Sequence, residues 1–181
     1  DASQAVINIV SEFETYAHRK TTLDPIDLLP LINAVTKSTI ALQMDRMDIV
    51  LPRASALITG NEVILRQVIA NILVNAVEAM EGQTRRSRIE FSISQKDCNP
   101  GFTRIAISDN GEGLEGDRLE AIFRRGVSSR SRSSGGLGLH WCANAVKVMG
   151  GTINAESAGK DLGATIIIEL PTFESKLKEA A

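Results

Sequence analysis

The sequence has 181 residues, of which 43% are hydrophobic and 4% aromatic. This length predicts one domain with a small appendage, and the composition predicts a core of aliphatic side chains. The formal net charge of -2 gives no global basis for nucleic-acid binding. Polar residues such as Arg66, Gln67 and Asn71 interrupt the most hydrophobic stretch, so we expect no membrane contact by this chain.

The start of the chain and its two cysteines indicate a cellular setting. Asp1 opens a polar stretch without the basic segment and apolar run of a secretory signal, and without an initiator methionine. We therefore expect a piece excised from a longer protein. Cys98 and Cys142 lack metal-ligand spacing, although His140 lies close to Cys142. Two such thiols predict reduced cysteines and a cytoplasmic location, whereas the parent protein could be membrane-anchored.

The first 20 residues carry apolar side chains at helical spacing. These are Val6, Val10, Phe13 and Ala17. Such a stripe predicts an amphipathic helix that needs a partner surface. Asp24-Pro25 breaks the pattern and predicts a boundary between a helical segment, 1–23, and a domain, 24–172. Residues 173–181 are expected to form a tail.

The domain alternates helical and strand patterns. Helices are predicted at 30–43, 62–80 (capped by Asn61), 117–123 and 138–149, the last ending at Gly150-Gly151. Strands are predicted at 48–51, 56–59, 88–94, 103–108, 152–156 and 164–170. Strands that can pair antiparallel, mixed with helices, predict a two-layer α/β sandwich rather than a parallel βαβ array.

The helix predicted at 62–80 has two unlike faces. Its apolar face comprises Leu65, Val68, Ile69, Ile72, Leu73, Ala76 and Met80, and its polar stripe Gln67, Asn71, Asn75 and Glu78. A polar stripe is often only the solvated face of a helix. Asparagine, however, is a poor helix former, and here it occurs twice, four residues apart. Two amide oxygens on one face can meet a magnesium ion and its phosphates.

A second motif, Asp109-Asn-Gly111-Glu-Gly113, follows a predicted strand. Asn-Gly is a strong hairpin signal, but a hairpin needs a second strand immediately afterwards. A helix-like run follows instead, through Leu119 and Ile122. A carboxylate followed by two glycines suits the close approach of a flat ligand.

Two glycine motifs complete the set. Gly135-Gly136-Leu137-Gly138 opens the helix predicted at 138–149, and exposed N–H groups at a helix start suit phosphate, although a flexible linker is the alternative. Gly163-Ala164-Thr165 precedes a strand, which is a common arrangement. Arg124, Arg125, Arg130 and Arg132 flank the glycine loop and suit a triphosphate, whereas Arg85, Arg86 and Arg88 are expected to be merely solvated.

In this order the four motifs resemble the ATP-binding boxes of the histidine-kinase, chaperone and mismatch-repair ATPase superfamily. The resemblance is greatest to the catalytic ATP-binding domain of bacterial sensor histidine kinases, and it covers most of residues 28–171. It implies the Bergerat fold, with ATP and Mg²⁺ as cofactors. Asn71, Asn75 and Ala76 match the pattern N-x-x-x-N-A. Asn75 is then the magnesium ligand, and Asn71 an assisting ligand or phosphate contact.

The resemblance also assigns the remaining motifs. Asp109 would accept a hydrogen bond from the adenine amino group, and Gly111 and Gly113 would admit the ring. Gly136, Leu137 and Gly138 would belong to the glycine motif and its lid, and Thr165 would lie beside the adenine. Ser134 stands where the family has its first glycine, and Arg130 where many relatives have a phosphate-contacting lysine.

This family implies transfer of the γ-phosphoryl group of Mg-ATP to a histidine. His18 and His140 lack the acidic neighbour and following proline of a phosphoacceptor, so we expect the acceptor on a dimerisation domain absent from this chain. No catalytic base is assigned here. The implied partners are that domain, a response regulator and a second copy of the parent protein.

Two other functions are alternatives to the kinase function. One is a superfamily ATPase or regulatory module that uses ATP to gate conformation or partner binding. Asn71, rather than a glutamate that activates water, stands four residues before Asn75 and favours the kinase. The other is a degenerate module without ATP, against which the intact motifs argue.

Overall fold

The computed structural model describes residues 22–96, 98–116, 118–124 and 138–174. Its strands are β1 (Asp24–Asp27), β2 (Met47–Val50), β3 (Leu57–Gly60), β4 (Ser87–Ser94), β5 (Phe102–Asp109), β6 (Thr152–Glu156) and β7 (Thr165–Pro171). Its helices are α2 (Leu28–Thr39), a 3-10 turn η1 (Met44–Arg46), α3 (Glu62–Ala79), α4 (Arg118–Ala121) and α5 (Gly138–Val148). The helical segment predicted for residues 1–23 lies almost wholly outside the described residues.

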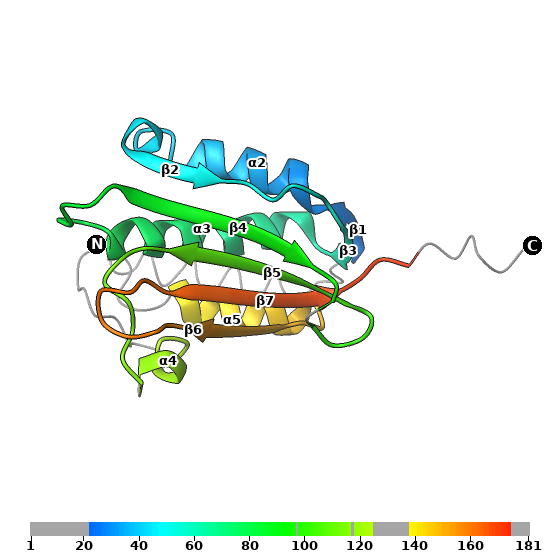
Figure 1. The fold of residues 1–181 in the computed structure, drawn as a ribbon. Coiled ribbons are helices and arrows are strands. Elements are labelled where there is room, and N and C mark those ends of the chain that lie inside the picture. Colours follow the sequence, from blue (N-terminus) through cyan, green and yellow to red (C-terminus); the bar gives the residue numbers. More distant parts are fainter. Residues whose placement is uncertain (1–21, 97, 117, 125–137, 175–181) are drawn as a thin grey trace, which may run out of the picture.

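The main sheet contains five strands in the order β2-β4-β5-β7-β6. β2 runs parallel to β4, and every other neighbouring pair is antiparallel. Helices α2, α3 and α5 lie side by side on one face of this sheet, with α3 in the middle (Figure 1). The predicted two-layer α/β sandwich is therefore confirmed. The predicted boundaries at residues 23 and 172 remain predictions.

Helix α3 forms because its apolar positions recur at helical spacing and all face the sheet. Each of the seven residues predicted for its apolar face is at most 5% exposed. The Asn61 side chain caps the helix as expected, with Oδ1 accepting a hydrogen bond from the N–H of Ile64 at 3.0 Å. The helix is therefore held firmly against the sheet, and its polar stripe is left on the other side.

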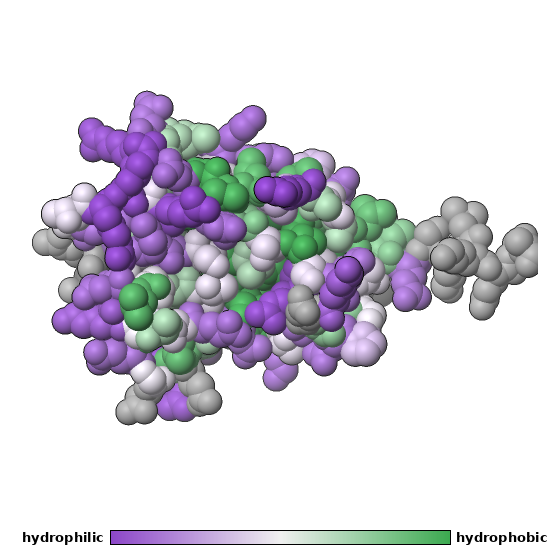
Figure 2. All heavy atoms as spheres, viewed as in Figure 1, coloured by the Kyte–Doolittle hydropathy of each residue, from purple (hydrophilic) through white to green (hydrophobic). Residues whose placement is uncertain are grey.

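The two faces of the sheet differ. Ile105 and Ile107 point toward the helices and belong to the apolar core. On the opposite face, Figure 2 shows mostly hydrophilic residues with a few apolar ones between them. Ile167 is only 4% exposed on that face, although it lies outside the core. Arg104 on β5 and Glu156 on β6 form an ion pair of 3.5 Å diagonally across β7, which places their side chains beside Ile167.

Two elements differ from the sequence-based expectations. Asp24-Pro25 was predicted only as a boundary, but these residues form β1, which pairs antiparallel with β3. Proline is tolerated because this two-stranded sheet has only edge strands. Helix α2 begins at Leu28 rather than Pro30, because Asp27 accepts a hydrogen bond from the N–H of Leu29 and caps it. It ends at Thr39, and residues 40–43, which were expected to continue it, form a bend and a turn ahead of η1.

The turn between α5 and β6 follows its prediction. Gly150 has a φ of +77°, and the N–H of Gly151 donates to the carbonyl of Val146 at 3.0 Å. This is the hydrogen-bond pattern of a glycine C-cap. Gly151 also lies so close to β7 that a Cβ atom there would collide with the carbonyl of Glu169 and approach the side chain of Leu170 to 2.8 Å.

The substitution Gly151→Ala is therefore expected to lower the free energy of unfolding by about 1–3 kcal/mol, because the added methyl group overpacks the contact with β7. Gly116→Ala is the matched control, since a Cβ atom at Gly116 meets no atom within 4 Å in the described structure. The control should change stability by less than about 0.5 kcal/mol. Urea unfolding of the two variants measures both values, and equal stabilities would contradict the packing described here.

Candidate nucleotide-binding site

Three loops meet at the end of the sheet where β5 ends, on the left in Figure 1. They follow α3 (residues 80–86), β5 (110–116) and β6 (157–164). The loop after β5 also contacts the end of α3, because the N–H of Glu112 donates to the carbonyl of Ala79 at 3.0 Å. The motif around Asp109 is thus fixed one helical turn beyond Asn75. The hairpin alternative for Asp109-Asn-Gly is excluded, since β5 pairs with β4 and β7.

Asp109 presents one fixed and one free carboxylate oxygen. Its Oδ1 accepts hydrogen bonds from the N–H groups of Gly111 at 2.8 Å and Ala164 at 3.3 Å. Among the residues that the structure describes, Oδ2 has no hydrogen-bonding partner. Burial raises the pKa of Asp109 above its ordinary value, and the two backbone hydrogen bonds oppose this rise. The carboxylate is therefore oriented and available to a donor.

Glycine is required where these loops touch. Gly163 has a φ of +76°, and a Cβ atom there would collide with the backbone of Asp109. Gly113 has a φ of +68°, and a Cβ atom there would collide with the carbonyl of Gly159. Gly111 lies against α3, where a Cβ atom would stand 2.6 Å from the carbonyl of Ala79. The predicted glycines Gly111 and Gly113 thus allow the close packing on which the position of Asp109 depends.

A serine that the sequence analysis missed joins the loops. Ser157 accepts a hydrogen bond from the N–H of Leu114 at 3.0 Å and donates one to the carbonyl of Gly163 at 2.6 Å. The N–H of Gly163 in turn donates to the carbonyl of Gly111 at 3.2 Å. Ser157 belongs to no motif, and only its position after β6 could have indicated a role.

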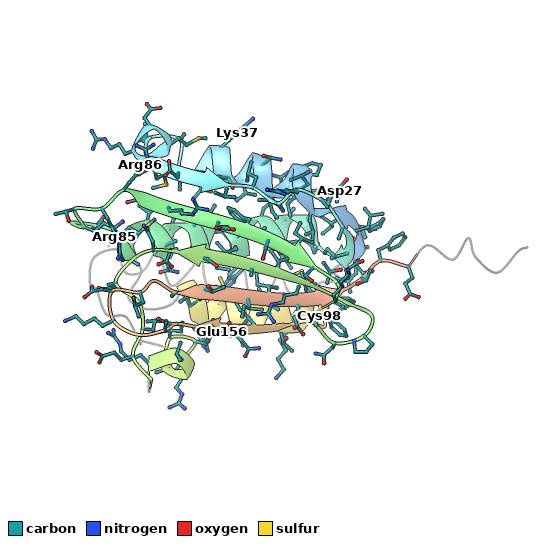
Figure 3. All side chains as sticks on the ribbon, viewed as in Figure 1. Asp27, Lys37, Arg85, Arg86, Cys98 and Glu156 are labelled. Atoms are coloured by element: carbon teal, nitrogen blue, oxygen red, sulfur yellow. The ribbon has the colours of Figure 1, made fainter. Side chains whose placement is uncertain are left out.

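The expectation that Arg85 is merely solvated is wrong. Its guanidinium donates hydrogen bonds to the carbonyls of Asn110, Gly111 and Asp161. Arg86 and Arg88 do lie at the surface, where they pair with Asp48 and Glu90 respectively. Figure 3 shows Arg85 and Arg86 at the same end of the sheet.

The polar stripe of α3 contains two asparagines in different environments. Asn75 donates through Nδ2 to the carbonyl of Asn71 at 2.8 Å, and its Oδ1 has no hydrogen-bonding partner in the described residues. Asn71 accepts from Gln67 Nε2 through Oδ1 at 3.0 Å and approaches Cys142 Sγ through Nδ2 at 3.8 Å. Asn75 thus has an available oxygen ligand, whereas both ends of the Asn71 amide contact protein.

The start of α5 lies beside Asn75. A Cβ atom built at Gly138 would stand 4.0 Å from Asn75 Nδ2. The N-terminus of α5 therefore lies close to this side chain, and the first N–H groups of a helix attract anions. His140, in the first turn, contacts the carbonyl of Phe123 through Nδ1 at 3.0 Å, which fixes the helix start against the residues after α4.

Other predicted site residues are not brought to this place, or lie outside the described structure. Thr165 is on the face of the sheet away from the helices, where its hydroxyl bonds to that of Ser108 at 2.8 Å. The neighbouring Ala164 contacts Asp109 through its backbone instead, because its N–H donates to Asp109 Oδ1 and its carbonyl accepts from the N–H of Asp109. Arg130, Gly136 and Leu137 lie outside the described residues, so their roles remain predictions.

Metal-binding clusters of three or more histidine, cysteine or acidic residues do not occur in the described part of the chain. Burial raises the pKa of the Cys142 thiol to about 12, so this cysteine is protonated and unsuited to binding metal. Within the same residues, no helix has the length and apolar character needed to span a membrane.

Comparison with known proteins agrees with this geometry. A family model described as "Histidine kinase-, DNA gyrase B-, and HSP90-like ATPase" matches residues 60–174. The two-component sensor PprA of Pseudomonas aeruginosa is 33% identical over 122 residues, which are 66% of this chain and 13% of PprA. The sensor histidine kinase ZraS of Klebsiella oxytoca is 36% identical over 110 residues, which are 59% of this chain and 22% of ZraS. The chain thus spans less than a quarter of either relative.

Solved structures share the fold. The mycobacterial sensor histidine kinase MprB matches with a TM-score of 0.70 and 22% identity, over 84% of this chain and 99% of that one. Full-length ShkA, solved in complex with AMPPNP, matches with a TM-score of 0.72 and 23% identity, over 86% of this chain and 32% of ShkA. With the family model covering most of its length and sensor kinases as its relatives, the chain belongs to the histidine kinase-, DNA gyrase B- and HSP90-like ATPase family, as a catalytic ATP-binding domain of the histidine kinase type.

Proposed function

We propose that this domain binds Mg-ATP and supplies the γ-phosphoryl group to a histidine on a dimerisation domain outside this chain. The observation that carries the proposal is Asp109 beside two closely packed glycines, with an Oδ2 that no other described residue binds. An ionised carboxylate accepts hydrogen bonds but cannot donate them. It therefore suits the amino group of adenine, whereas the carbonyl oxygen of guanine would face it with a second acceptor. Relatives named as sensor histidine kinases support the same activity.

The phosphates of ATP fit the space beside Asn75. The N-terminus of α5 and the Oδ1 of Asn75 supply N–H donors and an uncharged oxygen ligand there. Mg²⁺ prefers hard oxygen ligands and is commonly held by substrate phosphates and water with few protein ligands. Asn75 would hold the ion. The backbone carbonyl of Asn71 accepts from Asn75, and the Asn71 side chain, whose Oδ1 already accepts from Gln67, would assist as a second ligand or phosphate contact. The ion would neutralise charge on the phosphates.

Phosphoryl transfer needs little covalent help from the protein, because positioning and charge stabilisation provide most of the catalysis. In this scheme Asp109 and its glycines fix the base, while Asn75 and α5 fix the phosphates. Arg130 and Gly136 are proposed to contribute on the lid side. Asn71 occupies the position at which a water-activating glutamate would favour an ATPase, which supports the kinase function.

The wider setting is part of this proposal. We infer a cytoplasmic domain whose parent protein is a homodimer and passes its phosphoryl group to a response regulator. The names of PprA and ZraS as a two-component sensor and a sensor histidine kinase support this inference.

Replacing Asp109 by asparagine should weaken ATP binding by about 1.5–3 kcal/mol, or roughly ten- to a hundredfold, because an amide cannot replace the charged acceptor. Calorimetric titration of ATP into each protein measures this change. Glu115→Gln, a similar loss of charge at an exposed position of the same loop, is the control and should bind like the wild type. Unchanged affinity in a folded Asp109→Asn variant would remove Asp109 from the site.

The substitution Asn75→Ala should abolish most of the gain in ATP affinity that Mg²⁺ provides, because the free amide oxygen is lost. ATP is titrated with and without Mg²⁺ into the wild type, Asn75→Ala and Glu81→Ala. Glu81 is exposed just beyond the end of α3 and serves as the control. An equal magnesium effect in all three proteins would contradict the assignment.

Incubated alone with labelled ATP, this chain should bind nucleotide without acquiring acid-labile phosphate. His140 is held by the carbonyl of Phe123, and neither it nor His18 has an adjacent carboxylate to orient it for attack. Adding the parent's dimerisation segment should produce phosphohistidine. Strong labelling of the isolated chain at either histidine would contradict the proposal that the acceptor histidine lies on a separate dimerisation domain.

A further inference from the structure

We propose that Arg85 is a positioning residue of the nucleotide site, which holds the loops after β5 and β6 together and thereby sets the place of Asp109. The inference rests on the proposed binding of ATP by Asp109. Arg85 itself does not touch the nucleotide in this scheme. It lies in the loop after α3 and acts on the backbone around the carboxylate.

The contacts of Arg85 join three loops. One terminal nitrogen, NH2, donates to the carbonyl oxygens of Gly111 at 2.9 Å and Asp161 at 2.8 Å, and also to that of Asn110. The Nε atom donates to the Gln83 side chain at 3.2 Å, which orients the guanidinium from within its own loop. Residues 85, 110–111 and 161 are distant in the sequence, so this side chain provides a connection that local structure cannot.

Arg85 is linked to Asp109 through a single residue. Gly111 donates its N–H to Asp109 Oδ1, while its carbonyl accepts from Arg85 and from the N–H of Gly163. Both sides of Gly111 are therefore fixed. Without the guanidinium, three carbonyl dipoles would converge on a point with no positive charge. The loops would then separate, and the glycine N–H that orients the carboxylate would move with them.

The chemistry requires arginine rather than any cation. A guanidinium is a rigid planar fork with five N–H donors, whereas a lysine ammonium is a compact charge on a flexible stem. Lysine at this position keeps the charge, but its three donors lie on a single nitrogen, so it cannot bind the three carbonyls and also the Gln83 side chain, which Arg85 reaches through a second nitrogen, Nε. The neighbouring Arg86 offers a matched comparison, since its side chain pairs with Asp48 at 2.7 Å and both partners are about half exposed.

The test uses Arg85→Ala, Arg85→Lys and Arg86→Ala. ATP affinity is measured by calorimetry, and amide hydrogen exchange of the nucleotide-free proteins is followed at Asp161 and Gly163. Those two amides donate across the loop contact, to the carbonyls of Glu112 and Gly111. Arg85→Ala should bind ATP about tenfold more weakly and exchange faster at both amides. Arg85→Lys should recover little of this loss, and Arg86→Ala should match the wild type.

Chemical rescue separates positioning from general destabilisation. Guanidinium at low, non-denaturing concentration should partly restore ATP affinity to Arg85→Ala, and should leave Arg86→Ala unchanged. If the wild type binds ATP and Arg85→Ala binds equally well, the role of Arg85 is overturned and the proposed function stands. Equal losses in Arg85→Ala and Arg86→Ala, or full recovery in Arg85→Lys, would also overturn it. A wild type that does not bind ATP would overturn both proposals.

Discussion

The close approach of three backbone segments at the end of α3 is the constraint on which the site depends. The loop after β5 contacts the last turn of α3, and the loop before β7 contacts the loop after β5. A Cβ atom at Gly111, Gly113 or Gly163 would prevent these contacts. Only the glycine positions exclude side chains, so hydrogen bonds between backbone groups hold the junction together, supported by the side chains of Ser157 and Arg85. The position of Asp109, on which the proposed binding of adenine depends, therefore follows from these glycines.

Helix α3 connects this junction to the apolar core. Its buried face fixes the helix against the sheet, so every group on its polar stripe has a set position along one axis. From the C-terminal end, Ala79 contacts the Asp109 loop, Asn75 lies beside the start of α5, and Asn71 approaches Cys142. A base bound at Asp109 and phosphates bound at α5 would lie along this helix. The core therefore sets the distance between the two halves of the ligand site.

Sequence periodicity predicted the layers, because each apolar face is a local pattern of one helix or strand. The sequence also singled out Asp109, Asn75 and the glycines, because their motifs are continuous, and their roles in binding ATP remain predictions. It failed where a contact joins distant segments. An arginine in a polar loop is normally solvated, and nothing in the local sequence around Arg85 indicates otherwise. Only the folded loops bring three carbonyls to it. The predicted position of the Thr165 side chain differs from the structure for another reason. The motif gave its position but not its face of the sheet, and the strand turns its hydroxyl toward Ser108 instead.

The electrostatics of Asp109 link folding to binding. Burying a carboxylate is unfavourable unless its oxygens are hydrogen-bonded, and here only one of the two oxygens has partners among the described residues. Burial raises the pKa of Asp109, and the hydrogen bonds from Gly111 and Ala164 oppose this rise. Asp109 Oδ2 is not among the buried atoms without a partner, so a ligand amino group could reach it. Filling the position of Oδ2 with a protein donor would stabilise the fold but would remove the acceptor. The backbone hydrogen bonds to Oδ1 thus keep Oδ2 in place as the acceptor that the proposed binding of adenine requires.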